Sequence, residues 1–208
     1  MSTPVLYGIT GSRASRNLWL LEELGIAYER VLIDFKNKGC QTPEFLAINP
    51  NGHVPALVDG EVVMSESIAI NLYLARKQGG ELSAQTLAEE AQLLKWSFWA
   101  VTSIEKDALT VLMHTLVMPP EMRKPELVKQ AEGSLRKPLA VLEAHLAKHA
   151  YVLGNRFTVA DVNLAAMCSW VRPANALLQD HPQVAAWLAL CLGRPAYKKV
   201  QAFGQAEA

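Results

Sequence analysis

The chain has 208 residues and no net formal charge, because 20 lysines and arginines balance 20 aspartates and glutamates. This length suffices for one large domain or two small ones, and the balanced charge excludes the basic footprint of a nucleic-acid-binding protein. Half of the residues are hydrophobic, yet no apolar run reaches the roughly 18 residues that span a bilayer. We therefore expect neither a membrane protein nor a disordered chain.

The first part of the chain alternates strand-like and helix-like patterns. Residues 5–10 are rich in β-forming side chains, and residues 13–24 carry leucines at helical spacing. Residues 28–33 predict a second strand. Residues 42–44, Thr-Pro-Glu, are typical of the first turn of a short helix, with a capping hydroxyl, a proline and an acid. The order to this point is strand, helix, strand, helix.

A hairpin and a further helix follow. Asp59-Gly60, between the β-rich residues 54–58 and 61–64, is a strong two-residue turn signal, so these strands should pair antiparallel. Ser65 offers a cap to a helix over residues 68–77. The order β-α-β-α-β-β-α predicts an α/β domain, which we place at residues 1–79.

Strand signals disappear from residue 82 onward. Residues 82–117 are compatible with one long helix or with a broken pair. Residues 125–149 also predict a helix, which Gly133 and Pro138 either split or kink. We therefore place an all-helical domain at residues 85–208.

A capping box marks the start of another helix. Thr158-x-x-Asp161 precedes an apolar stretch and predicts a buried helix over residues 159–170. The box satisfies backbone amides, so its loss should harm folding before chemistry, and we leave both residues out of the candidate site. A last helix is predicted from His181-Pro182 to about Gly193.

The cysteines argue against a disulfide framework. Cys40, Cys168 and Cys191 are an odd number and form no C-x-x-C motif, which also argues against a zinc ribbon and against dithiol chemistry. The opening residues do not resemble a secretory signal. We expect a cytoplasmic protein, and any thiol chemistry to use a thiol from outside the chain.

Three motifs together resemble one enzyme family. Residues 49–57 (NPNGHVPAL), 65–70 (SESIAI) and 157–161 (FTVAD) occur in the order and spacing of the cytosolic glutathione S-transferases, and the likeness spans nearly the whole chain. It is nearest to serine-type, theta-like or related bacterial members. The resemblance implies a thioredoxin-like N-terminal domain, an all-helical C-terminal domain and a homodimer. It implies no metal and no cofactor, since glutathione is a co-substrate.

The resemblance also assigns glutathione-binding residues. In the family the bond before the residue matching Pro55 is cis, so that the backbone of Val54 would bind the cysteinyl part of glutathione. Ser67 would take the γ-glutamyl carboxylate at a helix N-terminus, where free amides and the helix dipole attract anions. Glu66 would take the γ-glutamyl ammonium, and His53 would lie near the glycyl carboxylate.

The residue that activates the thiol is the central question. A thiol with a pKa of about 8.5 must be shifted by roughly 1.5 to 2 units to be mostly thiolate at neutral pH. Ser12, between the first strand and the first helix, supplies a hydroxyl near a helix N-terminus and matches the serine of serine-type members. Tyr7 and Ser15 are rivals for this role. Arg13 and Arg16 flank the site and would add positive potential, but we expect them to be solvated or paired with acids such as Glu22 or Glu23.

The electrophile site would fall to the helical half. Trp99, Lys106 and Met113 lie at seven-residue intervals within the region that, in the family, faces the hydrophobic second substrate. The resemblance therefore implies an enzyme that joins glutathione to small hydrophobic electrophiles, without nucleic-acid or membrane partners. The alternatives are a non-enzymatic binding module on the same fold and a glutathione-dependent isomerase, dehalogenase or peroxidase.

Overall fold

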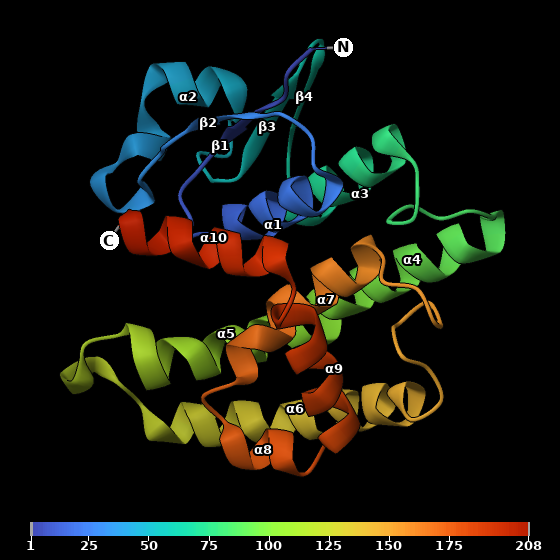
Figure 1. Cartoon of the computed structure of the whole chain (residues 1–208). Helices are drawn as coiled ribbons and strands as arrows, with labels where there is room; N and C mark the ends of the chain where they lie inside the picture. Colours follow the sequence, from blue (N-terminus) through green and yellow to red (C-terminus); the bar gives the residue numbers. More distant parts are fainter. Residues whose placement is uncertain (1, 208) are drawn as a thin grey trace. The chain divides into compact units, whose positions relative to one another are not determined.

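The computed structural model describes residues 2–207, apart from the side chain of Lys36. These residues form two compact units: residues 2–83 together with 194–207, and Ala84–Gly193. Figure 1 traces the chain from blue to red and labels its helices and strands. The final stretch belongs with the first unit, whereas the sequence grouped all of residues 85–208 together. The reason is packing, because the last helix lies along the first one.

A mixed sheet is the centre of the first unit. Within the described residues, β1 (Val5–Tyr7), β2 (Glu29–Val31), β3 (Ala56–Asp59) and β4 (Val62–Ser65) lie in the order β2-β1-β3-β4. β1 and β2 are parallel, and the other neighbouring pairs are antiparallel. The predicted hairpin is confirmed, with Gly60 at a φ of +62° in its turn. The thioredoxin-like arrangement expected for this half is therefore present.

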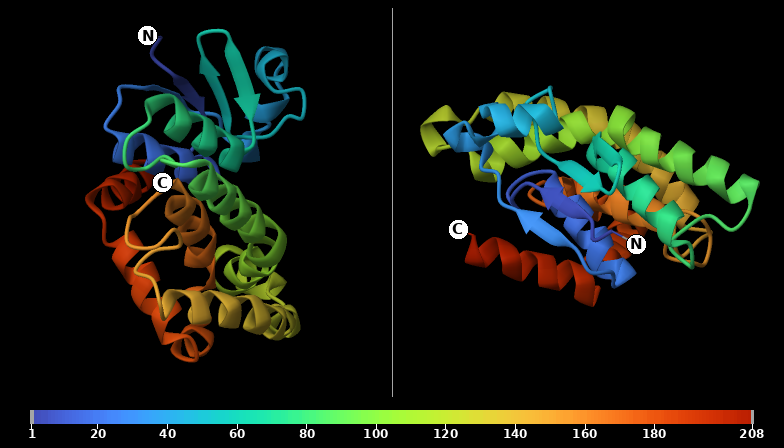
Figure 2. Two further views of the ribbon diagram at one scale, coloured as in Figure 1. Left: turned by 90° about the vertical axis from the view of Figure 1, so that its right-hand side faces the viewer. Right: turned by 90° about the horizontal axis from the view of Figure 1, so that it is seen from above.

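Helices cover both faces of this sheet. α1 (Ala14–Leu24) and α3 (Ser67–Gln78) pack against each other and against the strands, while α2 (Pro43–Ile48) lies on the other side (Figures 1 and 2). Short 3₁₀ turns at Phe35–Asn37 and Gly39–Gln41 lead into α2. The core on the α1 and α3 side consists of fully buried aliphatic side chains, among them Leu6, Leu18, Leu21, Leu57, Ile70 and Leu74.

The long helical region of the second unit is neither an unbroken α-helix nor a separated pair. α4 (Leu87–Ala100) continues through a π-helical segment, Val101–Glu105, into α5 (Lys106–Leu112) and a second π-helical segment, Met113–Val117. Backbone angles stay right-handed at the first junctions, so the axis continues while the number of residues per turn changes.

The remaining helices of this unit follow the predictions in part. α6 (Pro125–Leu146) runs unbroken through Gly133 and Pro138. α7 (Val159–Cys168) ends in a 3₁₀ turn at Ser169–Val171, and α9 (Pro182–Leu192) begins at the expected proline. The short α8 (Asn175–Gln179) and α10 (Pro195–Ala206) are not among the predicted helices, and α10 belongs to the first unit.

The capping box of α7 is confirmed and entirely buried. The Asp161 carboxylate accepts hydrogen bonds from the backbone amides of Thr158 (2.9 Å) and Val152 (3.0 Å) and from the indole of Trp187 (3.0 Å). Every residue of α7 is buried. Asp161 therefore joins three segments of the helical core, which is a structural role, as its position in the sequence indicated.

Two structural features are absent from residues 2–207. None of their helices combines the length and the apolar character that crossing a membrane requires. No group of three or more His, Cys, Asp and Glu side chains among them is placed to hold a metal ion. All three cysteines are buried, and none of them forms a disulfide bond within the described residues.

A buried carboxylate ties the hairpin to α3. The side chain of Asp59 is fully buried and accepts hydrogen bonds from Ser2 (2.9 Å), Tyr73 (2.9 Å) and Lys77. Burial alone would raise the pKa of Asp59. The donors, chiefly Lys77, outweigh this effect and hold the pKa below its ordinary value.

This depressed pKa predicts acid sensitivity. A carboxyl whose pKa is lower in the folded than in the unfolded state contributes stability that is present above the unfolded value, about 4, and is lost as the pH falls through the folded value. Asp59→Asn should cost about 1 to 3 kcal/mol at pH 7 and flatten the loss of stability below about pH 4. Denaturant titrations from pH 7 to pH 2 measure both effects.

The matched control is Asp180→Asn, since Asp180 pairs with Arg136 at the surface. It should change the free energy of unfolding by less than about 0.5 kcal/mol. An Asp59→Asn protein as stable as wild type at neutral pH would contradict the assignment.

Candidate functional site

A buried side chain stabilises the conformation of the loop before β3. The Val54-Pro55 bond is cis, as the resemblance implied, and Pro55 is buried. The side chain of Asn49, which is 3% exposed, donates to the carbonyl of His53 (2.6 Å) and accepts from the amide of Asn51 (3.2 Å). Asn49 thus fixes the loop, while the imidazole of His53 lies exposed at its rim.

Cys40 packs behind this loop. Its burial and the charge of Asp34 raise the pKa of the thiol, and a hydrogen bond from the backbone of Val54 opposes them without cancelling them. Since nucleophilic attack requires the thiolate, this environment disfavours Cys40 as a nucleophile. The expectation that the chain uses no thiol of its own fits this environment.

The chain bends sharply at the start of α3. Glu66, and not Ser65, is the N-cap residue, because Ser65 is still paired with Ala56 as the last residue of β4. Glu66 has a φ of +71° and a ψ of +108°, a conformation that costs a residue with a side chain about 1 to 3 kcal/mol. The bend leaves the Glu66 carboxylate exposed and Ser67 buried at the helix N-terminus.

Ser67 sits on a buried polar network between α1 and α3. Asn17 donates to the Ser67 carbonyl (2.7 Å) and to the Asn71 side chain (2.7 Å). The guanidinium of Arg16 donates to the Ser67 hydroxyl (3.3 Å), and Asn71 donates to the Arg16 carbonyl (3.3 Å). Arg16 is 2% exposed, so the expectation that it is solvated is wrong.

The loop between β1 and α1 carries Ser12. Its hydroxyl donates to the Ile9 carbonyl (2.7 Å) and accepts from the amide of Ala14 (3.1 Å). The hydroxyl of Ser15 donates to the Ser12 carbonyl (2.9 Å), so Ser15 is committed to its own helix. Ser12 lies one residue before the N-cap of α1, close to the positive end of the helix dipole.

Gly8 brings the two loops together. It has a φ of +139°, and a Cβ built on it would lie 3.3 Å from the Cβ of Val54, 3.5 Å from the Ser12 hydroxyl oxygen and 2.7 Å from the Cβ of Ala14. Ser12 and Val54 are therefore neighbours around a single backbone position. No sequence pattern signalled this contact, because it depends on a missing side chain at the end of β1.

Tyr7 faces a different environment. Its ring packs 6.2 Å from that of Phe45 and joins the apolar cluster of Cys40, Phe45 and Ala56 under α2. This placement is that of a packing residue on the sheet.

The three residues predicted for the electrophile site lie in the helical unit. The ring of Trp99 packs edge-on against Trp96 (5.2 Å), Lys106 is exposed and Met113 is half-buried. Their seven-residue spacing crosses the π-helical segment Val101–Glu105, where the number of residues per turn rises. An argument from α-helical spacing therefore does not by itself place them on one face.

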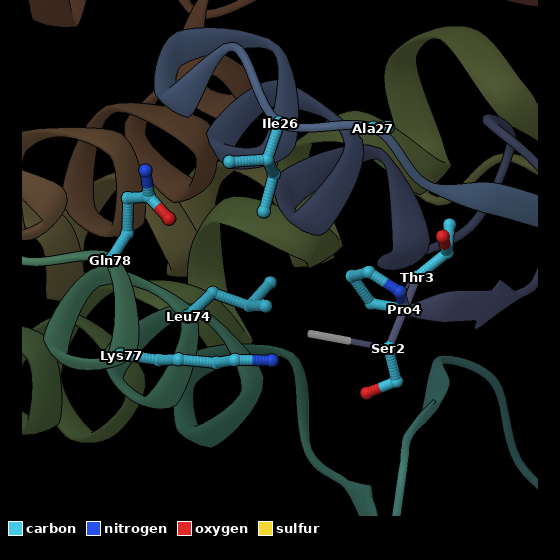
Figure 3. Close-up of a pocket in the computed structure, with 8 residues that line it drawn as sticks. All are labelled: Ser2, Thr3, Pro4, Ile26, Ala27, Leu74, Lys77 and Gln78. Atoms are coloured by element: carbon cyan, nitrogen blue, oxygen red, sulfur yellow. The ribbon is translucent and has the colours of Figure 1, made fainter.

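A separate hollow in the first unit lies away from these groups. It measures about 200 Å³, and the side chains of Pro4, Ile26 and Leu74 face one another across it, with Lys77 at its rim (Figure 3). The ammonium of Lys77 is already paired with Asp59. The hollow lies at the C-terminal end of α3, whereas Ser67 lies at its N-terminal end.

The fold and these loops define a class of protein: a thioredoxin-like unit with a cis-proline loop, an unusual backbone bend at a helix N-terminus, and a separate helical unit. The family models for the N-terminal and C-terminal domains of glutathione S-transferases match residues 2–76 and 125–190. The chain belongs to the cytosolic glutathione S-transferase family.

Individual relatives cover nearly the whole chain. Glutathione S-transferase 3 of Zea mays is 36% identical over 95% of this chain and 92% of its own length. Glutathione transferase F7 of Populus trichocarpa superposes with a TM-score of 0.89 at 27% identity, covering 97% and 99% of the two chains. A theta-class glutathione S-transferase of Xanthomonas axonopodis, solved with glutathione bound, has a TM-score of 0.84 at 30% identity and covers 96% and 97%.

The Gly8 junction gives a sharp prediction. Gly8→Ala introduces a strained φ and a contact of 2.7 Å with the Cβ of Ala14, so it should destabilise the fold by about 2 to 4 kcal/mol. Gly11→Ala is the matched control, since a Cβ there meets only Ile9 at 3.9 Å, and its effect should stay within about 0.5 kcal/mol. Urea denaturation measures both, and equal stability of the two variants would contradict the proposed junction.

Proposed function

We propose that this protein is a glutathione transferase that joins the thiolate of glutathione to small hydrophobic electrophiles. The observation that carries this proposal is the adjacency of Ser12 and Val54 around Gly8. A cysteinyl residue bound along the backbone of Val54 would bring its sulfur toward the Ser12 hydroxyl. Family membership and the full-length relatives named glutathione S-transferases support the same conclusion.

The proposed binding site uses one group for each charge of the tripeptide. The free amides at the start of α3 and the Ser67 hydroxyl would hold the γ-glutamyl carboxylate, with Arg16 behind Ser67 adding a positive charge. The exposed Glu66 carboxylate would bind the ammonium beside it. His53, at the loop rim, would face the glycyl carboxylate. Each charged group of glutathione is thus matched by a hydrogen-bond donor or by a group of opposite charge.

In the proposed mechanism Ser12 stabilises the thiolate and does not itself attack. Its hydroxyl hydrogen, which points to the Ile9 carbonyl, turns to the sulfur and donates a hydrogen bond there. The thiol proton passes to solvent. The sulfur electron pair then forms a bond to the electrophilic carbon, and either a leaving group departs with its electron pair or the neighbouring atom takes up the pair and a proton. Positioning and charge stabilisation supply the rate enhancement.

Ser12→Ala tests this mechanism. Without the hydroxyl, the pKa of the bound thiol should return toward about 8.5, so turnover of chlorodinitrobenzene at pH 6.5 should fall about tenfold to a hundredfold. Retention on immobilised glutathione should persist, because the carboxylate and ammonium contacts remain.

Tyr7→Phe is the control, since its ring packing is unchanged, and its pH–rate profile should match that of wild type. Equal turnover in wild type and Ser12→Ala would remove Ser12 from its role, and a loss in Tyr7→Phe would give the role to Tyr7.

The second substrate is proposed to bind beside the helical unit. Trp99 and Met113 would offer apolar and polarisable surface to a hydrophobic electrophile, and the exposed Lys106 would favour those with electron-withdrawing or anionic groups. A role in detoxification in the cytoplasm fits such a substrate range and three cysteines without a disulfide bond among the described residues. Glutathione serves as co-substrate, and no metal is required.

We also propose a homodimer. α4 and the residue after it expose a stripe of large apolar side chains at helical spacing: Leu87, Leu94, Phe98 and Val101, which are 82%, 38%, 60% and 39% exposed. A second copy of the chain would cover this apolar stripe, since exposed apolar surface of this kind marks an interface.

Phe98→Asp tests the dimer by placing a charge in the centre of the stripe. The dissociation constant should rise about tenfold to a hundredfold, as for the loss of an interface hot spot. Gln92→Glu adds a charge to an exposed position of the same helix outside the stripe and should have little effect. Sedimentation equilibrium measures both variants, and a monomeric wild-type protein would refute the dimer.

A further inference from the structure

α10 is fastened along the length of α1 within the first unit. At its start, Arg194 makes two hydrogen bonds with the Glu23 carboxylate (2.7 Å each), and the ring of Tyr197 packs edge-on against Trp19 (4.8 Å). Because these contacts lie at the C-terminal end of α1, the other end of α10 reaches the loop before α1. Figure 1 shows α10 beside α1.

At the C-terminal end of α10, the carboxylate of Glu207 binds the loop between β1 and α1. Glu207 accepts the backbone amide of Thr10 (2.8 Å) and its hydroxyl (2.7 Å), and its second oxygen pairs with Arg30. Gly204 lies directly over Thr10, so close that a Cβ there would be 3.1 Å from the Thr10 hydroxyl oxygen. A single side chain from the end of the chain thus satisfies both donors of Thr10.

Thr10 connects the Glu207 contact to Ser12. Only Gly11 separates it from Ser12, and Gly11 is exposed and has no side chain to hold the loop. On the other side, the Ser12 amide and hydroxyl both bond to Ile9. The orientation of the Ser12 hydroxyl therefore depends on where Ile9 and Thr10 are held.

We propose that Glu207 is a positioning residue that fixes the loop carrying Ser12 and so sets how well Ser12 stabilises the glutathione thiolate. This inference rests on the proposed role of Ser12. Arg30 neutralises the Glu207 carboxylate, so the loop gains a firm anchor without an unbalanced negative charge that would oppose a thiolate nearby. Hydrogen bonds from Thr10 and Arg30 also outweigh the effect of burial and keep the pKa of Glu207 low, which leaves the carboxylate ionised at neutral pH.

The experiment compares three variants of the full chain. Glu207→Ala removes the oxygen that accepts both hydrogen bonds from Thr10. Glu207→Gln keeps a carbonyl oxygen for Thr10 but loses the charge that pairs with Arg30. Lys199→Gln is the matched control, because it breaks an ion pair between α10 and Glu22 (2.7 Å) without touching the loop.

Two readouts separate positioning from mere fastening of α10. The first is the pH at which bound glutathione ionises, followed by ultraviolet absorbance of the thiolate. Glu207→Ala should raise the pKa of the bound glutathione thiol by about half to one unit. It should lower turnover at pH 6.5 about threefold to tenfold, with a smaller loss of turnover at pH 9. The thiol pKa and the turnover of Glu207→Gln should stay close to those of wild type, and those of Lys199→Gln should be unchanged.

The second readout is amide hydrogen exchange of residues 10–12 without glutathione. It should accelerate at least about tenfold in Glu207→Ala and stay unchanged in Lys199→Gln. If wild type forms no bound thiolate, the proposed function fails, and this exchange still decides whether Glu207 fixes the loop. Wild-type exchange in Glu207→Ala, or an ionisation shift of equal size in Lys199→Gln, would overturn the inference.

Discussion

The hydrogen bonds that Asn17 makes from α1 to α3 set the geometry on which the site depends. One amide nitrogen, fully buried, bonds both to the Ser67 carbonyl and to Asn71, so the two helices cannot slide past each other without breaking both bonds. A buried network of this kind is stabilising only when its members are paired, which makes it sensitive to small displacements. The start of α3, where the γ-glutamyl group would bind, is thereby held against the start of α1.

Other polar side chains of the first unit also hold separate elements together through hydrogen bonds. Asn49 fixes the cis-proline loop, Asp59 ties the hairpin to α3, and Glu207 ties α10 to Thr10. Each of these side chains forms hydrogen bonds with partly buried backbone or charged groups that would otherwise lack them. The proposed glutathione site thus lies on loops, but loops whose ends are anchored by polar contacts from neighbouring elements.

The sequence predictions that the structure confirms rest on interactions between residues close together in the chain. The Asp59-Gly60 turn, the Thr42-Pro43 start of α2 and the Thr158-x-x-Asp161 box each require only residues adjacent in the chain. The burial of Arg16 and the approach of Ser12 to Val54 around Gly8 depend on contacts between distant segments. Nor does periodicity reveal a π-helical segment, because the side chains of 101–105 suit an ordinary helix equally well. The glutathione-binding residues themselves came from resemblance to a family.

The position of α10 has a consequence for how this protein is made. The first unit is discontinuous in the chain, since Ala84–Gly193 is inserted between its two parts. During synthesis the ribosome completes the sheet, α1 and α3 well before Arg194 and Glu207 emerge, and meanwhile Trp19 and Glu23 lack the contacts that α10 makes with them. The loop that carries Ser12 consequently gains its contact with Glu207 only after the helical unit has been synthesised.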